Sequence, residues 1–301
     1  MKKLLVQKTF VLLLLLVTFA GCHKTEADIL GIVSTDEVRN NFGTVVEVSY
    51  SDNTKMYFHL LTDTTAEVVN YRWFYNSRTD PSLWVYRGDI VVPTKFVHQG
   101  KNYIVNCIGD HAFYQSAGWD QWSDHNINLI SSVVLPNTID TIRESAFSGC
   151  GYMTSLDIPN SVRYIGRCAF SGTKPTAMEL PDAIDVISGG LFSGCYTLTS
   201  VKLPDNIVGI EDNAFNATGF TSFEIPETVQ WLGMDILYDS EHLKTIYCRP
   251  TTPPAKNPNY FEDYIRICEN LRAIYVPAQS VELYKSDSAW RMYKDIIVGM
   301  D

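Results

Sequence analysis

Ser171-Gly-Thr-Lys174 is the segment that comes nearest to a catalytic motif, because a serine three residues before a lysine opens the active site of penicillin-binding enzymes. The same loop position carries Ser148 and Ser193 in neighbouring segments, where no lysine follows at that spacing. A serine that recurs without the lysine is explained by a structural role in the turn. We therefore expect Ser171 to have no nucleophilic role.

No other motif supplies a complete reaction centre. His-Glu-x-x-His, Gly-x-Ser-x-Gly, Walker A and EF-hand spacings do not occur. His111 and His125 could meet around a loop, but no cysteine or carboxylate joins them at metal-ligand spacing. The number of carboxylates alone does not exclude a pair of the kind that glycosidases use. The sequence predicts a chain that is not an enzyme and that uses no metal or cofactor.

Cysteines suggest either disulfides or packed thiols. An even number in an exported chain favours a disulfide framework. However, Cys150 and Cys195 hold the same position two repeats apart, about twice the ~4.8 Å strand spacing and too far for a disulfide. We expect packed thiols, with at least one disulfide as the alternative. The cysteines concerned are Cys107, Cys150, Cys168, Cys195, Cys248 and Cys268.

Aromatic residues gather in an insertion at 114–129. Trp119 and Trp122 lie in a polar stretch that begins at Tyr114. Tryptophans in a polar loop are typical of interface anchors and of sugar-stacking platforms. Packing of the loop onto the N-terminal region is the alternative. We predict these three residues as candidate binding residues.

A repeat of about 22–23 residues must position these groups. In one copy, Leu156 and Ile158 point to one face of a short strand and Asp157 to the other, and Pro159 ends the strand. An Ile and then an Ala-Phe pair follow as inward positions, and stacked neighbours bury these apolar faces. The copies are marked by Ile142–Phe147, Ile165–Phe170, Ile187–Phe192 and Ile210–Phe215, with degraded copies at Ile108–Phe113 and Leu232–Leu237.

The outward strand positions are expected to form one continuous face. It is mostly acidic in the middle and aromatic towards the C-terminus, and it is either a partner-binding surface or a solvated sheet face. The residues are Val134, Asp157, Glu179, Lys202, Glu224, Tyr247 and Tyr275.

The N-terminus predicts export. Three lysines precede an apolar run over residues 10–19, and Cys22 follows directly after small residues. The run is too short to cross a bilayer. The site resembles a bacterial lipobox, which implies acylation of Cys22 and attachment to the membrane through lipid only. Residues 23–28 loosely resemble an acidic signal for surface export, so we expect an outer-membrane lipoprotein, exposed at the cell surface or facing the periplasm.

Net charge excludes one partner class. The formal net charge is −10, and it becomes more negative when the signal segment with its three lysines is removed. An acidic chain lacks the basic footprint that phosphate contacts need. Nucleic-acid binding is therefore not expected.

The repeat resembles the BspA-type, or Treponema pallidum-type, leucine-rich repeat. The run from Ile158 through Val162 and Ile165 to Phe170 matches that consensus almost residue by residue, and the likeness covers about 104–248 strongly and both flanks weakly. It implies a β-rich leucine-rich-repeat solenoid with an N-terminal β cap and a small C-terminal helical cap. It also implies adhesion or protein binding at the cell envelope of Bacteroides-like bacteria.

The expected organisation follows from these signals. It comprises a signal peptide (1–21), a lipidated tether (22–42), a β-rich cap (43–105), the repeats (106–248) and a last repeat with an insertion and the C-terminal cap (249–301). Within the last part, 274–277 is expected to be the final strand and 281–293 a short helix. We expect a monomer that binds a host or bacterial surface protein, or else a glycan-binding lipoprotein accessory to polysaccharide uptake.

Overall fold

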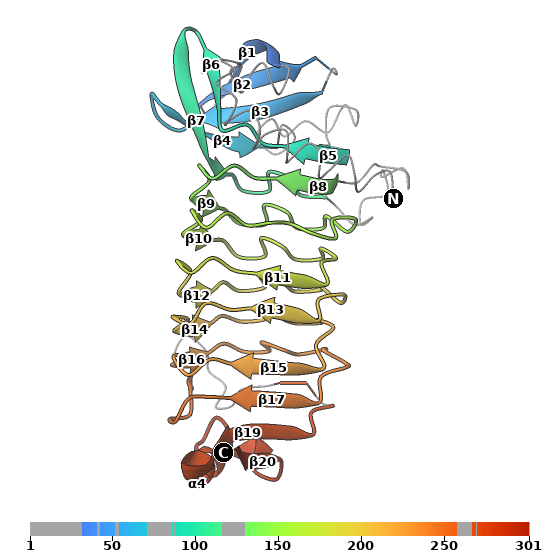
Figure 1. Cartoon of the computed structure of the whole chain (residues 1–301), viewed down its shortest axis with the longest axis vertical. Coiled ribbons are helices and arrows are strands. Elements are labelled where there is room, and N and C mark those ends of the chain that lie inside the picture. The colour runs from blue at the N-terminus through green and yellow to red at the C-terminus, as the bar shows by residue number, and fades with distance from the viewer. Residues whose placement is uncertain are drawn as a thin grey trace, which may run out of the picture.

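A computed structural model describes residues 32–40, 43–51, 54–70, 86, 88–115, 130–257, 267–268 and 270–300. The molecule is an elongated stack of coils, with an N-terminal sheet at one end and a short helix at the other (Figure 1). The expected solenoid with two caps is confirmed. No helix among the described residues is long and apolar enough to cross a membrane.

The N-terminal cap is an antiparallel sheet. Its strands are β1 (Ile32–Asn40), β2 (Gly43–Tyr50), β3 (Lys55–Leu60) and β4 (Thr65–Val69). Val46 and Val48 of β2 are fully buried, which anchors the sheet.

β1 corrects the expected tether over residues 22–42, because its part from Ile32 onward is a strand paired with β2. The strand was not predicted because the sequence of β1 is mostly polar. β1 lies at the edge of the sheet, where charged residues are tolerated and guard against pairing with other chains.

The cap is joined to the repeats by one continuous sheet. β4 pairs in parallel with β7 (Lys101–Ile108), which also pairs with β6 (Lys95–His98) and continues to β9 (Thr141–Ile142) and β10 (Tyr164–Ile165). Beside this sheet, β5 (Gly88–Val91) pairs with β8 (Ile130–Val134).

A buried carboxylate bridges this junction. Glu67 of β4 is 5% exposed, and its carboxylate lies 2.9 Å from His59 Nδ1 and 3.3 Å from an Arg143 guanidinium nitrogen. Arg143 follows β9, so the ion pair connects the cap to the first coils. Removing one partner of such a pair leaves a buried charge uncompensated.

The repeats build two ladders of short parallel strands on opposite sides of the coils (Figure 1). One ladder continues from β9 and β10 with β12 (Val186–Ile187), β14 (Gly209–Ile210), β16 (Trp231–Leu232) and β18 (Ala255–Lys256). The other contains β11 (Ala177–Glu179), β13 (Ser200–Lys202), β15 (Ser222–Ile225), β17 (Thr245–Cys248), β19 (Ala273–Pro277) and β20 (Ile297–Met300).

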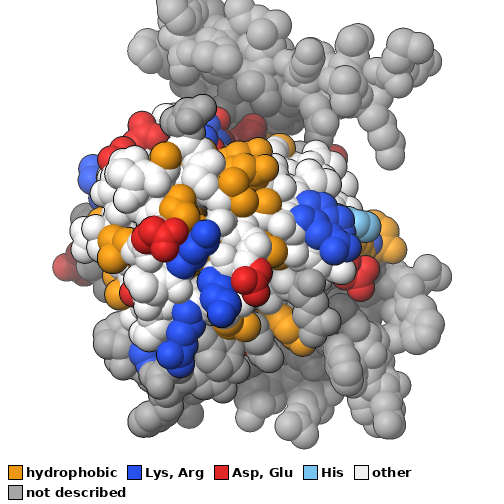
Figure 2. Space-filling view, turned by 90° about the horizontal axis from the view of Figure 1, so that it is seen from below, with side chains coloured by type: hydrophobic (Ala, Val, Ile, Leu, Met, Phe, Trp, Pro, Cys, Tyr) orange, Lys and Arg blue, Asp and Glu red, His pale blue; other side chains and the backbone are white. Residues whose placement is uncertain are grey.

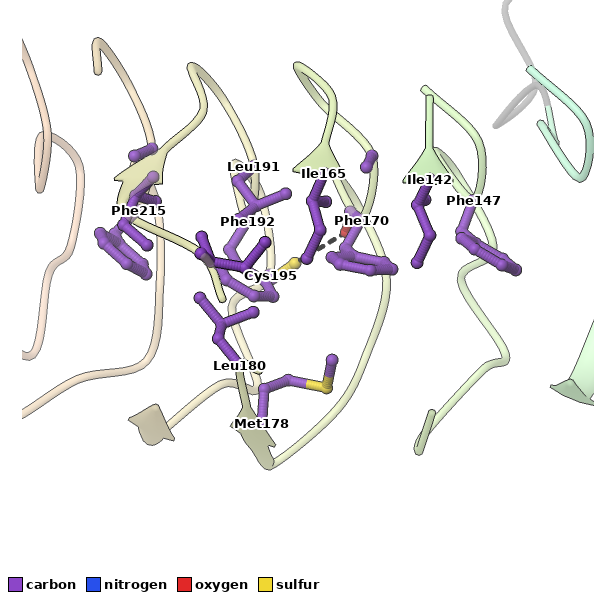
Figure 3. Packing of buried hydrophobic residues seen from close by; sticks show 14 of the residues in the cluster. Ile142, Phe147, Ile165, Phe170, Met178, Leu180, Leu191, Phe192, Cys195 and Phe215 are labelled. Carbon is purple, nitrogen blue, oxygen red and sulfur yellow. Dashed lines mark hydrogen bonds between the residues drawn. The ribbon is translucent and has the colours of Figure 1, made fainter. Parts of the chain in front are cut away.

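Between the ladders, one phenylalanine from each coil stacks on the next. The Phe147, Phe170, Phe192 and Phe215 rings form a column beside the inward isoleucines (Figure 3). The centroids of Phe170 and Phe192 are 5.6 Å apart, and their planes differ by 22°. Each ring therefore supplies buried area to two neighbours, which is why a single coil has no stable core of its own.

Each coil also turns through left-handed backbone. Three residues after the inward Ile or Leu, φ lies near +55° in most coils, and four residues later φ is again positive. The first position is held by His111, Ser145, Cys168, Gly190, Asn213 and Asp235, and the second by Gly149, Gly172, Gly194, Ala217 and Asp239.

The six cysteines after Cys22 are free thiols in the structure, as the main expectation had it. Cys150 and Cys195 do occupy one repeat position. The Cys195 thiol donates to the Phe170 carbonyl oxygen at 3.1 Å, and the hydroxyl of Thr218, at the same position, donates to the carbonyl oxygen of Phe215 at 3.0 Å. This position therefore selects a small donor, whether sulfur or oxygen.

The C-terminal cap is α4 (Val281–Ser286), preceded by a 3-10 turn at Ala278–Ser280 and followed by one at Arg291–Tyr293. The helix expected over 281–293 is interrupted at Asp287, whose backbone is extended. Tyr284 and Trp290 are fully buried, and they donate to the carbonyl oxygens of Pro250 and Pro254. The outer surface of this end carries mixed charges among scattered hydrophobic side chains (Figure 2).

β20 also differs from expectation. The strand at 274–277 is not the last, because the chain returns after the cap and adds β20 in parallel to β19.

Candidate interaction surface

The structure brings the outward strand residues together in register. Glu179 of β11 lies opposite Lys202 of β13, and Glu224, Tyr247 and Tyr275 lie opposite one another on β15, β17 and β19. We call these five residues, with Arg249 and Val298, the outward strand face. Asp157 is exposed one coil earlier but lies outside any strand, and Val134 is exposed at the end of β8.

Salt bridges neutralise the acidic middle of this face. Lys202 Nζ pairs with Glu179, and an Arg249 guanidinium nitrogen lies 3.0 Å from a Glu224 carboxylate oxygen. The hydrogen bond and the charge of Glu179 raise the pKa of Lys202. Both pairs are exposed and add little to stability. Their effect is to pair the acidic residues Glu179 and Glu224 with cations.

The C-terminal half of the face is aromatic. The rings of Tyr247 and Tyr275 stack with centroids 5.3 Å apart and planes 14° from parallel. Arg249 lies 5.7 Å from the centroid of Tyr247, within range of a cation–π contact. Val298 of β20 is opposite Tyr275 and is 45% exposed. Charge-paired residues therefore border a patch of rings and one aliphatic side chain.

Sequence reasoning missed Arg249 and Val298. Arg249 was detectable, because it lies two residues after Tyr247 and alternate residues of a strand share a face. Val298 was not, since the segment that contains it follows the cap and showed no repeat signal.

The aromatic insertion is only partly described. Trp119 and Trp122 lie outside the described residues, so their binding role stays a prediction. Tyr114 is half-buried, and its ring meets the His111 ring edge-on at 5.6 Å. Burial lowers the pKa of His111. Tyr114 therefore packs at the base of the insertion.

The expected non-catalytic reading of Ser171 agrees with its contacts. Its hydroxyl donates to the Ser193 carbonyl oxygen of the next coil at 2.9 Å. Lys174 instead lies over two tyrosine rings. Within the described part of the chain, no three His, Cys, Asp or Glu side chains gather as a metal site would require.

Comparison with known proteins identifies the repeat. Residues 125–244 match the family described as "BspA type Leucine rich repeat region", in six copies. No curated protein matches the chain.

Solved structures of bacterial leucine-rich-repeat proteins are similar to this chain at low sequence identity. The pneumococcal vaccine antigen PcpA is 16% identical with a TM-score of 0.50, over 81% of this chain and 51% of its own, so this chain spans about half of it. A leucine rich cell surface protein from Faecalibacterium prausnitzii is 20% identical with a TM-score of 0.49, over 83% and 72%. The T. pallidum leucine rich repeat protein is 15% identical with a TM-score of 0.38, over 80% and 85%.

The consensus spacing, the two strand ladders and the phenylalanine column thus have one explanation: residues 125–244 of this chain form a BspA-type leucine-rich repeat region.

Proposed function

We propose that this protein is a cell-envelope lipoprotein that mediates adhesion by binding a protein on a host or bacterial surface through its outward strand face. The observation that carries the proposal is a patch in which the exposed Tyr247 and Val298 flank the half-buried Tyr275, beside two salt bridges. An apolar, aromatic centre with a polar rim is the usual anatomy of a protein interface.

Rigidity favours the same face. The two tyrosines already restrict each other by stacking, and their strands pair in the core ladder. Side chains that are ordered before binding lose less conformational entropy on association. Stacked coils also present an extended surface, which suits a macromolecular partner better than a small molecule.

Anchoring at the outer membrane is part of the proposal and rests on the lipobox-like sequence at Cys22. Cys22→Ser should abolish incorporation of labelled fatty acid and release the protein from the membrane fraction. Protease treatment of intact cells then tests orientation. Digestion of the wild-type protein supports surface display, whereas survival places it facing the periplasm.

Binding is tested with the Cys22→Ser chain, which remains in solution. We expect saturable retention on at least one immobilised host matrix protein (fibronectin, laminin or collagen) or on whole bacterial cells pretreated with protease inhibitor. Prior protease treatment of those bacterial cells should remove the retention. Retention that survives this treatment, is competed by polysaccharide and is unchanged by Tyr247→Ser with Tyr275→Ser would contradict a protein partner for the outward strand face.

The glycan-binding alternative rests on Trp119 and Trp122. A polysaccharide titration monitored by tryptophan fluorescence measures it directly, and a saturable shift that Trp119→Ala abolishes would favour it over the protein partner.

A further inference from the structure

A second exposed cluster lies on the loops that lead into the β11 ladder. Lys174 Nζ is 5.7 Å from the ring centroid of Tyr152 and 5.5 Å from that of Tyr196. The three residues come from three successive coils, so one ammonium group stands between two aromatic rings that are two coils apart, roughly 10 Å at the spacing of neighbouring strands. We call Tyr152, Lys174 and Tyr196 the tyrosine–lysine row.

Both rings of the row are open to solvent. Tyr152 is 61% exposed and Tyr196 is 59% exposed, the two highest values among the exposed large hydrophobic side chains of the described residues. In the next coil, Gly219 packs so closely on the Tyr196 carbonyl oxygen that an added Cβ would lie 2.5 Å from it. Gly219 therefore places no side chain beside the Tyr196 ring. Exposed rings held at a fixed spacing present flat apolar faces to a ligand.

The loops around the row are rich in hydroxyls and free of acids. Segments 150–155, 173–177 and 195–200 contain no Asp or Glu, in a chain whose net charge is −10. They expose the hydroxyl residues Thr154, Ser155, Thr176, Thr199 and Ser200.

Lys174 is the one charged side chain of these three segments. No carboxylate of the described residues forms an ion pair with it; its contacts are the two rings. A hydrogen bond with Tyr196 raises the pKa of Lys174. A lysine side chain is in any case an ammonium cation at neutral pH. A cation without an acidic partner retains its capacity to bind an anion.

We propose that the tyrosine–lysine row binds an anionic glycan chain. The two rings stack on the apolar faces of sugar residues, Lys174 pairs with a carboxylate or sulfate group on the chain, and the surrounding hydroxyls exchange hydrogen bonds with sugar hydroxyls. Each type of group in the row matches one feature of that ligand: ring faces, negative charge and many hydroxyls.

Negative charge on the rest of the molecule confines binding of an anionic glycan to the tyrosine–lysine row. An acidic protein repels polyanions over its surface at distances up to the Debye length, about 10 Å at 0.1 M salt. Nucleic acid needs several phosphate contacts and meets a single cation here. The row is separate from the outward strand face in residues and in ligand class, so either site can fail without the other.

The test uses isothermal titration of the Cys22→Ser chain with three defined oligosaccharides: oligogalacturonate, chondroitin sulfate oligosaccharide and neutral malto-oligosaccharide. We expect binding of at least one acidic oligosaccharide and none of the neutral one. Oligogalacturonate alone would assign a carboxylate ligand. Binding of chondroitin sulfate that is lost with the desulfated oligosaccharide, which keeps its carboxylates, would assign a sulfate.

Variants locate the site. Lys174→Gln should weaken binding by about tenfold and remove most of its salt dependence, and Tyr152→Ala with Tyr196→Ala should weaken it by about tenfold or more. The matched controls are Lys244→Gln, an exposed lysine that precedes β17, and Tyr164→Ala, a tyrosine that is 56% exposed on β10. Both controls should bind within about twofold of wild type.

Two results would overturn the proposal. One is no heat of binding with either acidic oligosaccharide at millimolar concentration. The other is equal affinity for wild type, Lys174→Gln and the double tyrosine variant, with circular dichroism showing that all three are folded.

Discussion

Tyr247 and Tyr275 stack nearly parallel on adjacent coils, with ring centroids 5.3 Å apart, although an insertion separates their strands in the chain. The insertion leaves the register intact, since Tyr247 and Tyr275 remain directly opposite in the β17–β19 pair. The aromatic end of the outward strand face is thus fixed by the same ladder that builds the core.

The phenylalanine column should carry much of the stability. Phe170 is 1% exposed and stacks on rings at both sides. We expect Phe170→Ala to lower the free energy of unfolding by about 3–5 kcal/mol, measured by urea denaturation. Phe170→Leu should cost less, and the surface change Tyr164→Ser should stay within about 0.5 kcal/mol. A loss below about 1 kcal/mol for Phe170→Ala would contradict the role of the column.

The left-handed turn position predicts opposite effects at two sites. Gly194 has φ of +74°, and an added Cβ would meet only ordinary contacts at 3.8 Å, so Gly194→Ala tests the backbone alone. It should destabilise by about 1 kcal/mol. Ala217 has φ of +53° at the same position, and Ala217→Gly should stabilise by up to about 1 kcal/mol. Thermal unfolding measures both, and two shifts of the same sign would refute the argument.

Thiol reactivity should separate the cysteines. Burial raises the pKa of Cys107 to about 12, of Cys195 to about 11 and of Cys248 to about 12. Thiolate is the reactive form, so these three should react slowly with Ellman's reagent at pH 8 in the native Cys22→Ser chain. Cys168 is only half-buried and should react first. The reaction of Cys168 should appear as a fast phase that is absent in Cys168→Ser. In denaturant, all six thiols of the Cys22→Ser chain should react. A fast phase that persists in Cys168→Ser would count against this order.

Asp212 predicts a pH effect. Burial raises its pKa above the ordinary 3.8, against the hydrogen bond from the Met234 amide at 2.8 Å. A raised folded-state pKa means that the native protein binds the proton more tightly than the unfolded chain does. Stability from this group is therefore greatest below pH 3.8 and falls as pH rises through the raised value.

Asp212→Asn removes that charge and keeps an oxygen that can accept the Met234 hydrogen bond. We expect the variant to be more stable than wild type at pH 7, with a smaller advantage at pH 3.5, by urea denaturation at both values. A stability advantage of Asp212→Asn that grows as the pH falls would contradict a raised pKa of Asp212 in the folded protein.

Repetition made most of the fold predictable. Each Ala-Phe pair and each Leu-x-Ile-Pro strand occurs several times, so an error in one copy is corrected by the next. Cys150 and Cys195 were placed correctly by register alone, as was the alignment of Glu224, Tyr247 and Tyr275.

Segments that occur once were harder to predict. β1 is a polar edge strand, and its pairing with β2 is satisfied by backbone hydrogen bonds that leave little trace in side-chain pattern. β20 pairs after a cap that interrupts the repeat. The neutralisation of Glu224 was not predicted, because its partner Arg249 lies on the neighbouring coil and composition does not show which charged residues pair.

The central claim is that the aromatic half of the outward strand face binds a protein partner. It is tested most directly by the dissociation constant of the retained surface protein for three chains: wild type, Tyr247→Ser with Tyr275→Ser, and Tyr164→Ser. Tyr164 is the matched control, a more exposed tyrosine on the opposite ladder. We predict at least about a thirtyfold weaker constant for the double variant and less than about a twofold change for Tyr164→Ser. Equal constants for the wild type and a folded double variant would contradict the claim.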